Sequence, residues 1–345
     1  MTLMWKEILE QPQVLKKCSE ANTQIVKEIA DELKKRDIRS IVIAARGTSD
    51  HAAVYGKYIF ESLTGLPVVL AAPSVVTVYG RSLKLENSLV IGISQSGKAG
   101  DAAEIIRMGN ACNTVTVSIT NYVDSPLAKL SKYHLFCDAG EEKSVAATKT
   151  FTAQMYLLAM LAVEISHENS LKKNLTDVFD EMTKVFEISG QITEVAKRYR
   201  FMKECFVLAR GFNYPIALEA ALKIQETTYI RAKAFATSDF YHGPMAMIDK
   251  NMPVIVYAPS DETLSDVTEM IKKLKEAEAD LLVVSDQEDV CALGDCSLQI
   301  PKIKDGFTSV FSNAAVAQMF ACNLSVLRRL NPDKPRMLHK VTITR

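Results

Sequence analysis

The sequence predicts an α/β protein of two similar lobes, each a doubly wound, mostly parallel sheet flanked by helices. Runs rich in β-branched residues alternate with segments of helical periodicity, which is typical of parallel βαβ units. The segment IVIAARGTS at 41–49 is similar to CFVLARGFN at 205–213. Because such long-period self-similarity indicates duplicated domains, we expect two lobes on one plan, each with a roughly five-stranded parallel sheet.

In the first half, residues 1–37 are predicted to be helical, since Ile25, Ile29 and Leu33 lie at helical spacing. Four strands are expected after them, with helices between them. The strands are 38–45, 88–93, 113–119 and 133–139, and the helices are 51–63 and 102–108.

The second half repeats these elements. Its segments 254–260, 280–286 and 298–306 correspond to 90–96, 114–120 and 134–142, and a charged helical stretch separates the two halves. The expected division is a helical segment over 1–37, a first lobe over 38–168, a helical linker over 169–197, a second lobe over 198–330 and a tail over 331–345.

Composition excludes several classes of protein. Lys plus Arg and Asp plus Glu both number 41, so the surplus of positive charge that non-specific nucleic-acid binding needs is absent. The start of the chain has no signal-peptide pattern, and we identify no apolar run of the roughly 18 residues that a membrane span needs. The apolar segment 152–165 is expected to be a buried helix. Seven scattered cysteines without metal spacing indicate reduced thiols and a cytoplasmic protein with neither metal nor cofactor.

Three polar loops follow predicted strands of the first lobe. They are Arg46-Gly47-Thr48-Ser49, Ser94-Gln95-Ser96-Gly97 and the segment GEEKSVAATK at 140–149. Ligands of open parallel sheets bind beyond the carboxyl ends of strands, where N–H groups at helix starts suit a phosphate. The alternative for each loop is a helix-capping turn. Three such loops in one lobe favour a phosphosugar site.

The predicted helix 216–229 is apolar around much of its circumference. Its charged residues Glu219, Lys223 and Glu226 lie at i, i+4 and i+7, on one narrow stripe. Such a stripe faces either a polar cavity or solvent, and periodicity alone does not decide between them. In a cavity, a carboxylate beside an ammonium can remove a proton from carbon.

Two further residues are candidates on weaker patterns. His242 precedes a Gly-Pro turn in DFYHGPMAMID, where a loop histidine without a catalytic role is the alternative. Lys340 lies in the tail PRMLHKVTITR, whose pattern alone predicts an edge strand with a solvated lysine.

These motifs, taken together, resemble the isomerase domain of glutamine:fructose-6-phosphate amidotransferases, of the sugar isomerase (SIS) class. The resemblance extends from KEILEQP near the start to KVTIT near the end. Its most specific segments are RGTS, SQSG, EEKSVAATKTFTAQ, ARGFNYPIALEAALKIQE, HGPMAMID and NPDKPRMLHKVT. Stand-alone SIS-type glucosamine-6-phosphate deaminases and phosphosugar isomerases are also similar.

The resemblance implies roles for single residues. It implies that Glu226 moves a proton between C1 and C2, that Lys223 assists it and that His242 opens the sugar ring. Lys340 matches a lysine that forms a Schiff base with the ketose. The positions implied to bind the substrate are Thr48, Ser49, Ser94, Gln95, Ser96, Val145 and Ala147.

Two positions depart from the pattern of the family, because Ala99 and Ala147 stand where a threonine and a serine are usual. Each departure removes a hydroxyl near the phosphate or sugar. The chain also has no glutaminase domain, so we expect it to release ammonia from glucosamine 6-phosphate rather than capture it. The family pattern further implies a homodimer in which His242 enters the site of the partner subunit.

Two other functions stay open on the sequence. One is an isomerase or fructosamine-phosphate deglycase for another phosphosugar, which would keep the same residues. The other is a non-catalytic phosphosugar sensor, which the presence of Glu226, His242 and Lys340 disfavours.

Overall fold

The computed structural model describes residues 1–340, so residues 341–345, including the end of the predicted tail strand, lie outside the described residues. The chain divides into two compact units. The β1–β5 unit comprises residues 13–142, 149–176 and, of the described tail, 339–340. The β6–β10 unit comprises residues 1–12, 143–148 and 177–338.

The β1–β5 unit contains a five-stranded, fully parallel sheet in the order β2-β1-β3-β4-β5. Its strands are β1 (Ser40–Ala44), β2 (Val68–Leu70), β3 (Ser88–Ile93), β4 (Val115–Thr120) and β5 (Tyr133–Phe136). Its helices are α2 (Gln11–Leu33), α3 (Thr48–Thr64), α4 (Ser74–Thr77), α5 (Gly100–Ala111), α6 (Pro126–Leu130), α7 (Lys149–Ser166) and the first part of α8 (Asn169–Glu187).

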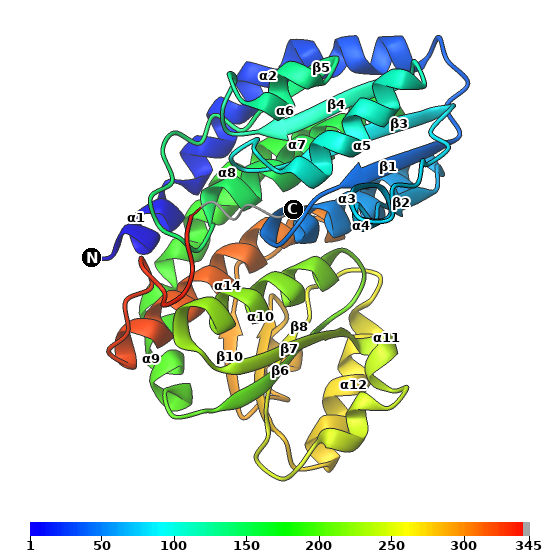
Figure 1. The fold of residues 1–345 in the computed structure, drawn as a ribbon. Coiled ribbons are helices and arrows are strands. Elements are labelled where there is room, and N and C mark those ends of the chain that lie inside the picture. Colours follow the sequence, from blue (N-terminus) through cyan, green and yellow to red (C-terminus); the bar gives the residue numbers. More distant parts are fainter. Residues whose placement is uncertain (341–345) are drawn as a thin grey trace. The chain divides into compact units, whose positions relative to one another are not determined.

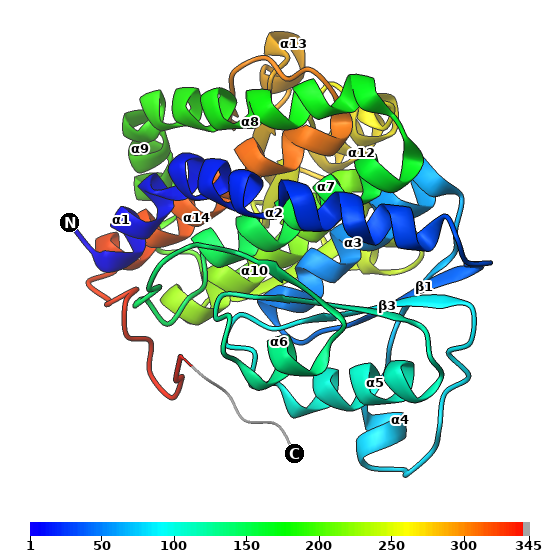
Figure 2. The same cartoon turned by 90° about the horizontal axis from the view of Figure 1, so that it is seen from above.

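Helices cover both faces of this sheet, as Figure 2 shows for α3 and α7 on one side and α5 and α6 on the other. On the first face Gly56 of α3 lies so close to Ile43 and Leu158 that a Cβ would approach them to 3.1–3.2 Å. On the second face Val42 and Val90 pack with the apolar side of α5. The strands are therefore buried on both faces, which explains their continuous apolar sequences.

The β6–β10 unit contains a second parallel sheet, in the order β10-β9-β8-β6-β7. Its strands are β6 (Glu204–Ala209), β7 (Arg231–Ala236), β8 (Pro253–Tyr257), β9 (Asp280–Ser285) and β10 (Cys296–Gln299). Its helices are α1 (Leu3–Leu9), the rest of α8, α9 (Ser189–Tyr199), η1 (Gly211–Asn213), α10 (Tyr214–Thr228), α11 (Thr237–Phe240), η2 (Pro244–Met247), α12 (Leu264–Glu276), α13 (Glu288–Cys291) and α14 (Gly306–Leu327).

The two sheets have the same topology, which confirms the predicted fold. When β6 is matched to β1, β7 matches β2, and β8, β9 and β10 match β3, β4 and β5, with the order of neighbours preserved. Figure 1 shows the strands of each sheet side by side. The order 2-1-3-4-5 is that of a doubly wound fold, in which ligands bind at the carboxyl ends of the strands.

Three elements differ from the sequence expectations. The edge strands β2 and β7 were not expected, because β2 has three residues and β7, RAKAFA, mixes charge with small side chains. The statement that no apolar segment is long enough for a membrane span is wrong for α14 by length and mean hydropathy. Among residues 1–340, α14 alone meets that test, and 83% of its apolar window is buried inside the protein.

Candidate functional site

The polar loops after β1 and β3 lie at the same edge of the first sheet, because the two strands are neighbours. Thr48 and Ser49 form the first turn of α3, and Ser94 and Gln95 directly follow β3. Arg46, the first residue of the first loop, donates from Nε to Asp101 Oδ2 of α5 at 2.9 Å, and Asp101 is 3% exposed. This buried carboxylate fixes the first loop against the helix that follows the second.

The residues at the N-cap positions of the two helices after these loops do not support the capping alternative. The residue before α3 is Gly47 and the residue before α5 is Ala99, and neither makes a side-chain cap hydrogen bond. Ser96 Oγ instead accepts from Lys98 N at 3.3 Å within its own loop. The backbone N–H groups at the start of α5 therefore have no capping side chain from position 99.

Gly97 is the residue that allows the second loop its turn. Its φ is +65°, and a Cβ at this position would lie 2.1 Å from Ser125 Oγ. Its N–H donates to Ser94 O at 3.1 Å, and its carbonyl accepts from Leu127 N of α6 at 3.1 Å. A side chain at position 97 would therefore have to displace either the loop or the start of α6.

A cavity of about 290 Å³ brings the second loop together with Lys340. Its lining comprises Gln95, Ser96, Lys98, Tyr122, Asp124, Ser125, Pro126 and Lys340. The Lys340 side chain is 23% exposed, and its Nζ lies 2.6 Å from Glu142 Oε2. The pattern-based expectation of a solvated lysine in an edge strand is therefore wrong for the described tail, since residues 331–340 contain no strand.

Glu142 is a functional candidate that the sequence analysis missed. It is 3% exposed, and it accepts from Thr150 N at 3.0 Å, from Thr150 Oγ1 at 2.8 Å and from Lys340 Nζ. Helix capping was the alternative for the loop 140–149, and its Glu142 carboxylate does accept hydrogen bonds from the first turn of α7. The available signal was the acidic pair Glu141-Glu142 in the loop that leads to an apolar helix.

In the β6–β10 unit, the charged stripe of α10 is buried, so the solvated alternative is wrong. Lys223 is 0% exposed, and its Nζ lies 3.3 Å from Glu219 Oε1 and 2.5 Å from Glu226 Oε2. Burial alone would lower the pKa of Lys223, but the carboxylates of Glu219 and Glu226 reverse this effect and raise it above its ordinary value. Lys223 is therefore an ammonium at neutral pH and cannot itself accept a proton there.

The three residues of this stripe differ in their access to a ligand. The side chains of Glu219 and Lys223 are 1% and 0% exposed, whereas that of Glu226 is 21% exposed. Glu226 is therefore the member that can reach a bound molecule, and it forms an ion pair with the ammonium of Lys223. This arrangement suits proton transfer at a carbon atom.

The predicted sugar-lining residues Val145 and Ala147 lie in a loop, 143–148, that two other segments of the same unit hold. Glu7 of α1, 5% exposed, accepts from Lys143 N at 2.5 Å and from Ser144 N at 3.3 Å. Val145 N donates to Asp333 O at 3.2 Å, and the Asp333 carboxylate accepts from Leu3 N and Met4 N at 2.9 and 2.8 Å. The loop is thus fixed through its backbone, and the side chains of Val145 and Ala147 are half-buried.

His242 lies apart from the buried stripe. It follows α11 on the loop before η2, where it is exposed and its backbone N donates to Asp239 O at 3.0 Å. Among residues 1–340 its ring makes no hydrogen bond, to Glu226 or to any other residue. The geometry of this unit alone does not join His242 to the proposed base.

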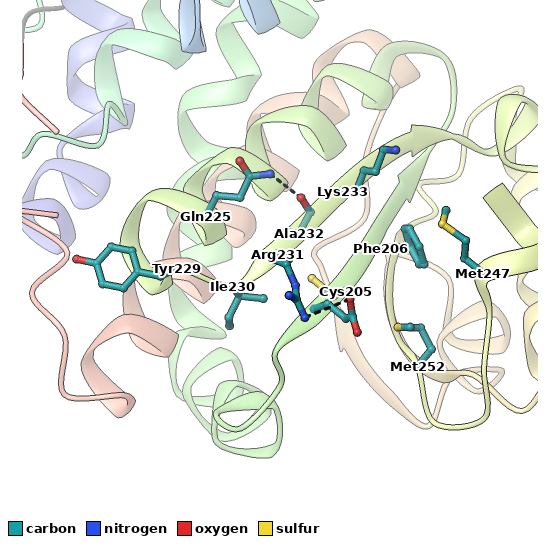
Figure 3. Close-up of a pocket in the computed structure, with 11 residues that line it drawn as sticks. Cys205, Phe206, Gln225, Tyr229, Ile230, Arg231, Ala232, Lys233, Met247 and Met252 are labelled. Atoms are coloured by element: carbon teal, nitrogen blue, oxygen red, sulfur yellow. Dashed lines mark hydrogen bonds and ion pairs between the residues drawn. The ribbon is translucent and has the colours of Figure 1, made fainter. Parts of the chain in front are cut away.

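A larger cavity, of about 580 Å³, lies in the β6–β10 unit, at the amino ends of β6 and β7 (Figure 3). It begins at Glu204 and Arg231, the first residues of β6 and β7, whose side chains form an ion pair at 3.8 Å. Gln225 Nε2 donates to Ala232 O at 2.5 Å across it. None of the predicted site residues lines this cavity. Because ligands of doubly wound sheets bind at the carboxyl ends, the smaller cavity with Gln95 and Lys340 is the stronger candidate.

Two segments of the chain, residues 34–164 and 200–328, match the family model of the SIS domain. Glutamine--fructose-6-phosphate aminotransferases [isomerizing] are 31% identical in Thermococcus kodakarensis, over 98% of this chain and 57% of the relative, and 33% identical in Aquifex aeolicus, over 99% and 57%. The chain thus spans a little over half the length of these relatives.

Solved structures agree on the fold. The C-terminal domain of glucosamine-fructose-6-phosphate aminotransferase from Francisella tularensis superposes with a TM-score of 0.87 at 25% identity, covering 97% of this chain and 98% of that one. Glucosamine-6-phosphate deaminase from Thermotoga maritima superposes with a TM-score of 0.81 at 23% identity, covering 99% and 100%. At 23% identity, the likeness to the Thermotoga maritima structure shows the fold alone.

We predict that Gly97→Ala weakens binding of a hexose 6-phosphate by roughly 10- to 100-fold, since the displaced loop loses hydrogen bonds to a charged group worth about 1.5–3 kcal/mol each. Isothermal titration calorimetry measures this affinity. Gly100→Ala is the matched control, because its Cβ would meet no atom within 4 Å. Equal affinities in the two variants would place the phosphate elsewhere.

Proposed function

Because the chain belongs to the SIS domain family, we propose that it is a phosphosugar enzyme that converts glucosamine 6-phosphate and water into fructose 6-phosphate and ammonia. The observation that carries the proposal is the cavity in which Gln95 and Ser96 meet the ammonium of Lys340. Hydroxyl and N–H groups suit the phosphate and hydroxyls of the sugar, and a lysine amine suits the ketose carbonyl carbon.

In the proposed reaction the isomerisation comes first. His242 assists opening of the ring, and the Glu226 carboxylate removes the proton from C2 of the open-chain amino aldose. The same group returns the proton to C1, while the C1 oxygen gains a proton and the C2 nitrogen loses one, so the C2 amine becomes a C2 imine. Lys223 stabilises the negative charge that develops during this transfer, because it remains cationic.

Release of ammonia follows from the imine. The neutral amine of Lys340 adds to C2 and expels ammonia, which leaves a Schiff base between Lys340 and the ketose. Water then adds to this Schiff base, and breaking of the carbon–nitrogen bond gives fructose 6-phosphate and free Lys340. The sum consumes one water and needs no oxidant or reductant.

A second candidate is an isomerase or deglycase for another phosphosugar, which Ala99 and Ala147 favour. Ala99 precedes α5 without a side-chain cap hydrogen bond, so the phosphate loop lacks a hydroxyl there. A different sugar that reaches the loop from another angle would tolerate this loss. The catalytic residues would be the same, and only the product distinguishes the two candidates.

The deciding experiment is a coupled assay with purified protein. Glucosamine 6-phosphate should give fructose 6-phosphate and ammonia in equal amounts, and EDTA should leave the rate unchanged. A panel of other hexose and fructosamine phosphates is tested alongside it. Turnover of a different phosphosugar without ammonia would select the second candidate, and no turnover of any would favour a sensor.

Glu226→Gln should lower turnover by about 10²–10⁴-fold, because the amide keeps the shape of the side chain but cannot accept a proton. Exchange of the C2 hydrogen with deuterated solvent, followed by NMR, measures the same step directly. Glu276→Gln at the exposed end of α12 is a control for loss of one carboxylate. Undiminished C2 exchange in Glu226→Gln would assign the base to another residue.

We further propose a homodimer in which His242 completes the site of the partner subunit. Exposure of His242, without any ring hydrogen bond within residues 1–340, supports this role, and a two-fold interface would form two such sites at once.

Subunit exchange tests the arrangement. Inactive His242→Ala and inactive Glu226→Gln proteins are mixed and allowed to form random pairs. About a quarter of wild-type activity should return if the two residues act across the interface. No recovery, or a monomer in light scattering, contradicts the proposal.

A further inference from the structure

The strongest unassigned feature of the molecule is the buried carboxylate of Glu142 beside Lys340. Glu142 lies after β5 and before α7, with its side chain 0% exposed. Three donors approach it: Thr150 N at 3.0 Å, Thr150 Oγ1 at 2.8 Å and Lys340 Nζ at 2.6 Å. Two of the donors belong to one residue of a helix, so the carboxylate is held in one orientation.

A carboxylate buried to this degree is stable only when hydrogen-bonded and paired with a cation. The helix supplies two donors and a favourable dipole at its N-terminus, and Lys340 supplies a positive charge. Lys340 comes from a tail segment without helix or strand, so no ladder of its own orients it. The carboxylate therefore fixes the lysine more than the lysine fixes the carboxylate.

The same lysine lines the cavity of Gln95 and Ser96. Its ammonium thus has one side against a fixed carboxylate and another side open to the space proposed for the sugar. An ammonium has no lone pair and cannot attack a carbonyl carbon, so a nearby base has to take one proton before the amine reacts. Glu142 is a carboxylate within hydrogen-bond distance of that proton.

We propose that Glu142 is the positioning residue of Lys340. The Glu142 carboxylate holds the amine of Lys340 at the cavity of Gln95 and Ser96 and exchanges the proton that the attack of the amine requires. The inference rests on the proposed function, because it assumes that Lys340 forms a Schiff base. It deepens that function by assigning the proton of the lysine to a named acceptor.

Formation of the Schiff base from the ketose, the reverse of the hydrolysis proposed above, balances in atoms and charge. The Lys340 ammonium gives one proton to the Glu142 carboxylate and becomes an amine. Its lone pair forms a bond to the ketose carbonyl carbon, and the carbonyl π pair moves to oxygen, which takes the proton back from Glu142. Loss of that oxygen as water, after a second proton transfer, gives the imine.

The experiment is reductive trapping at Lys340. Wild-type protein is incubated with fructose 6-phosphate and sodium borohydride, and mass spectrometry of peptides follows the sugar adduct on Lys340. Glu142→Gln should trap at least 100-fold more slowly, with affinity for inorganic phosphate unchanged in calorimetry. Glu141→Gln, an exposed neighbour with the same change of charge, should trap at the wild-type rate.

Two further variants keep the test decisive. Glu142→Ala should regain trapping when formate is added, but not with chloride, because formate can occupy the emptied position as a proton acceptor. Thr150→Val keeps the carboxylate and removes one of its donors, so it should trap about tenfold more slowly even if Glu142→Gln does not fold.

The outcomes distinguish a failure of the proposed function from a failure of the role of Glu142. If wild-type protein forms no adduct at Lys340, the Schiff-base role in the proposed function fails, and the inference fails with it. If wild type forms the adduct and Glu142→Gln and Thr150→Val do so equally fast, the proposed function stands and the role of Glu142 is overturned. Lack of rescue by formate overturns the proton exchange.

Discussion

A buried charge is stable only with fixed partners, and each unit of this protein contains such a charge beside a candidate site residue. In the β6–β10 unit the fully buried ammonium of Lys223 lies between Glu219 and Glu226 on one helix. Breaking one side of such a network typically costs about 3–5 kcal/mol. The network therefore fixes the rotamer of Glu226, the member that solvent reaches. In the β1–β5 unit the charge is Glu142, held by Thr150 and Lys340. Neither buried charge adds much net stability to the fold, but each defines the orientation of the side chains beside it.

Both sheets have the same strand order, yet the residues after equivalent strands differ. β3 is followed by Ser94-Gln95-Ser96, whereas its counterpart β8 is followed by Ala258-Pro259-Ser260. Ser260 Oγ donates a hydrogen bond to Asp286 Oδ2 at 2.6 Å. In the first unit, Gln95 and Ser96 after β3 line a cavity. In the second, the helix after β6, α10, carries the partly exposed carboxylate of Glu226.

The sequence predicted the sheets well because buried parallel strands have continuous apolar runs that few other elements share. It missed β2 and β7, because edge strands are short or mixed in composition and gain their order from a single neighbour. It could not decide whether the stripe of Glu219, Lys223 and Glu226 is solvated, since helical periodicity gives the direction of a face but not what covers it. Packing of α14 along α10 decides this in the structure.

The role of Glu142 was beyond sequence reasoning for a related reason. Its partner Lys340 is far away in the chain, and no local pattern encodes a contact of that separation. Asp333 is a similar case, because it joins α1 to the loop of Val145 and also begins the tail segment that leads to Lys340. Within the β1–β5 unit, the ion pair of Lys340 with Glu142 orients the amine at the cavity, because residues 331–340 contain neither helix nor strand. An irregular tail can therefore carry an oriented group when a buried carboxylate holds it.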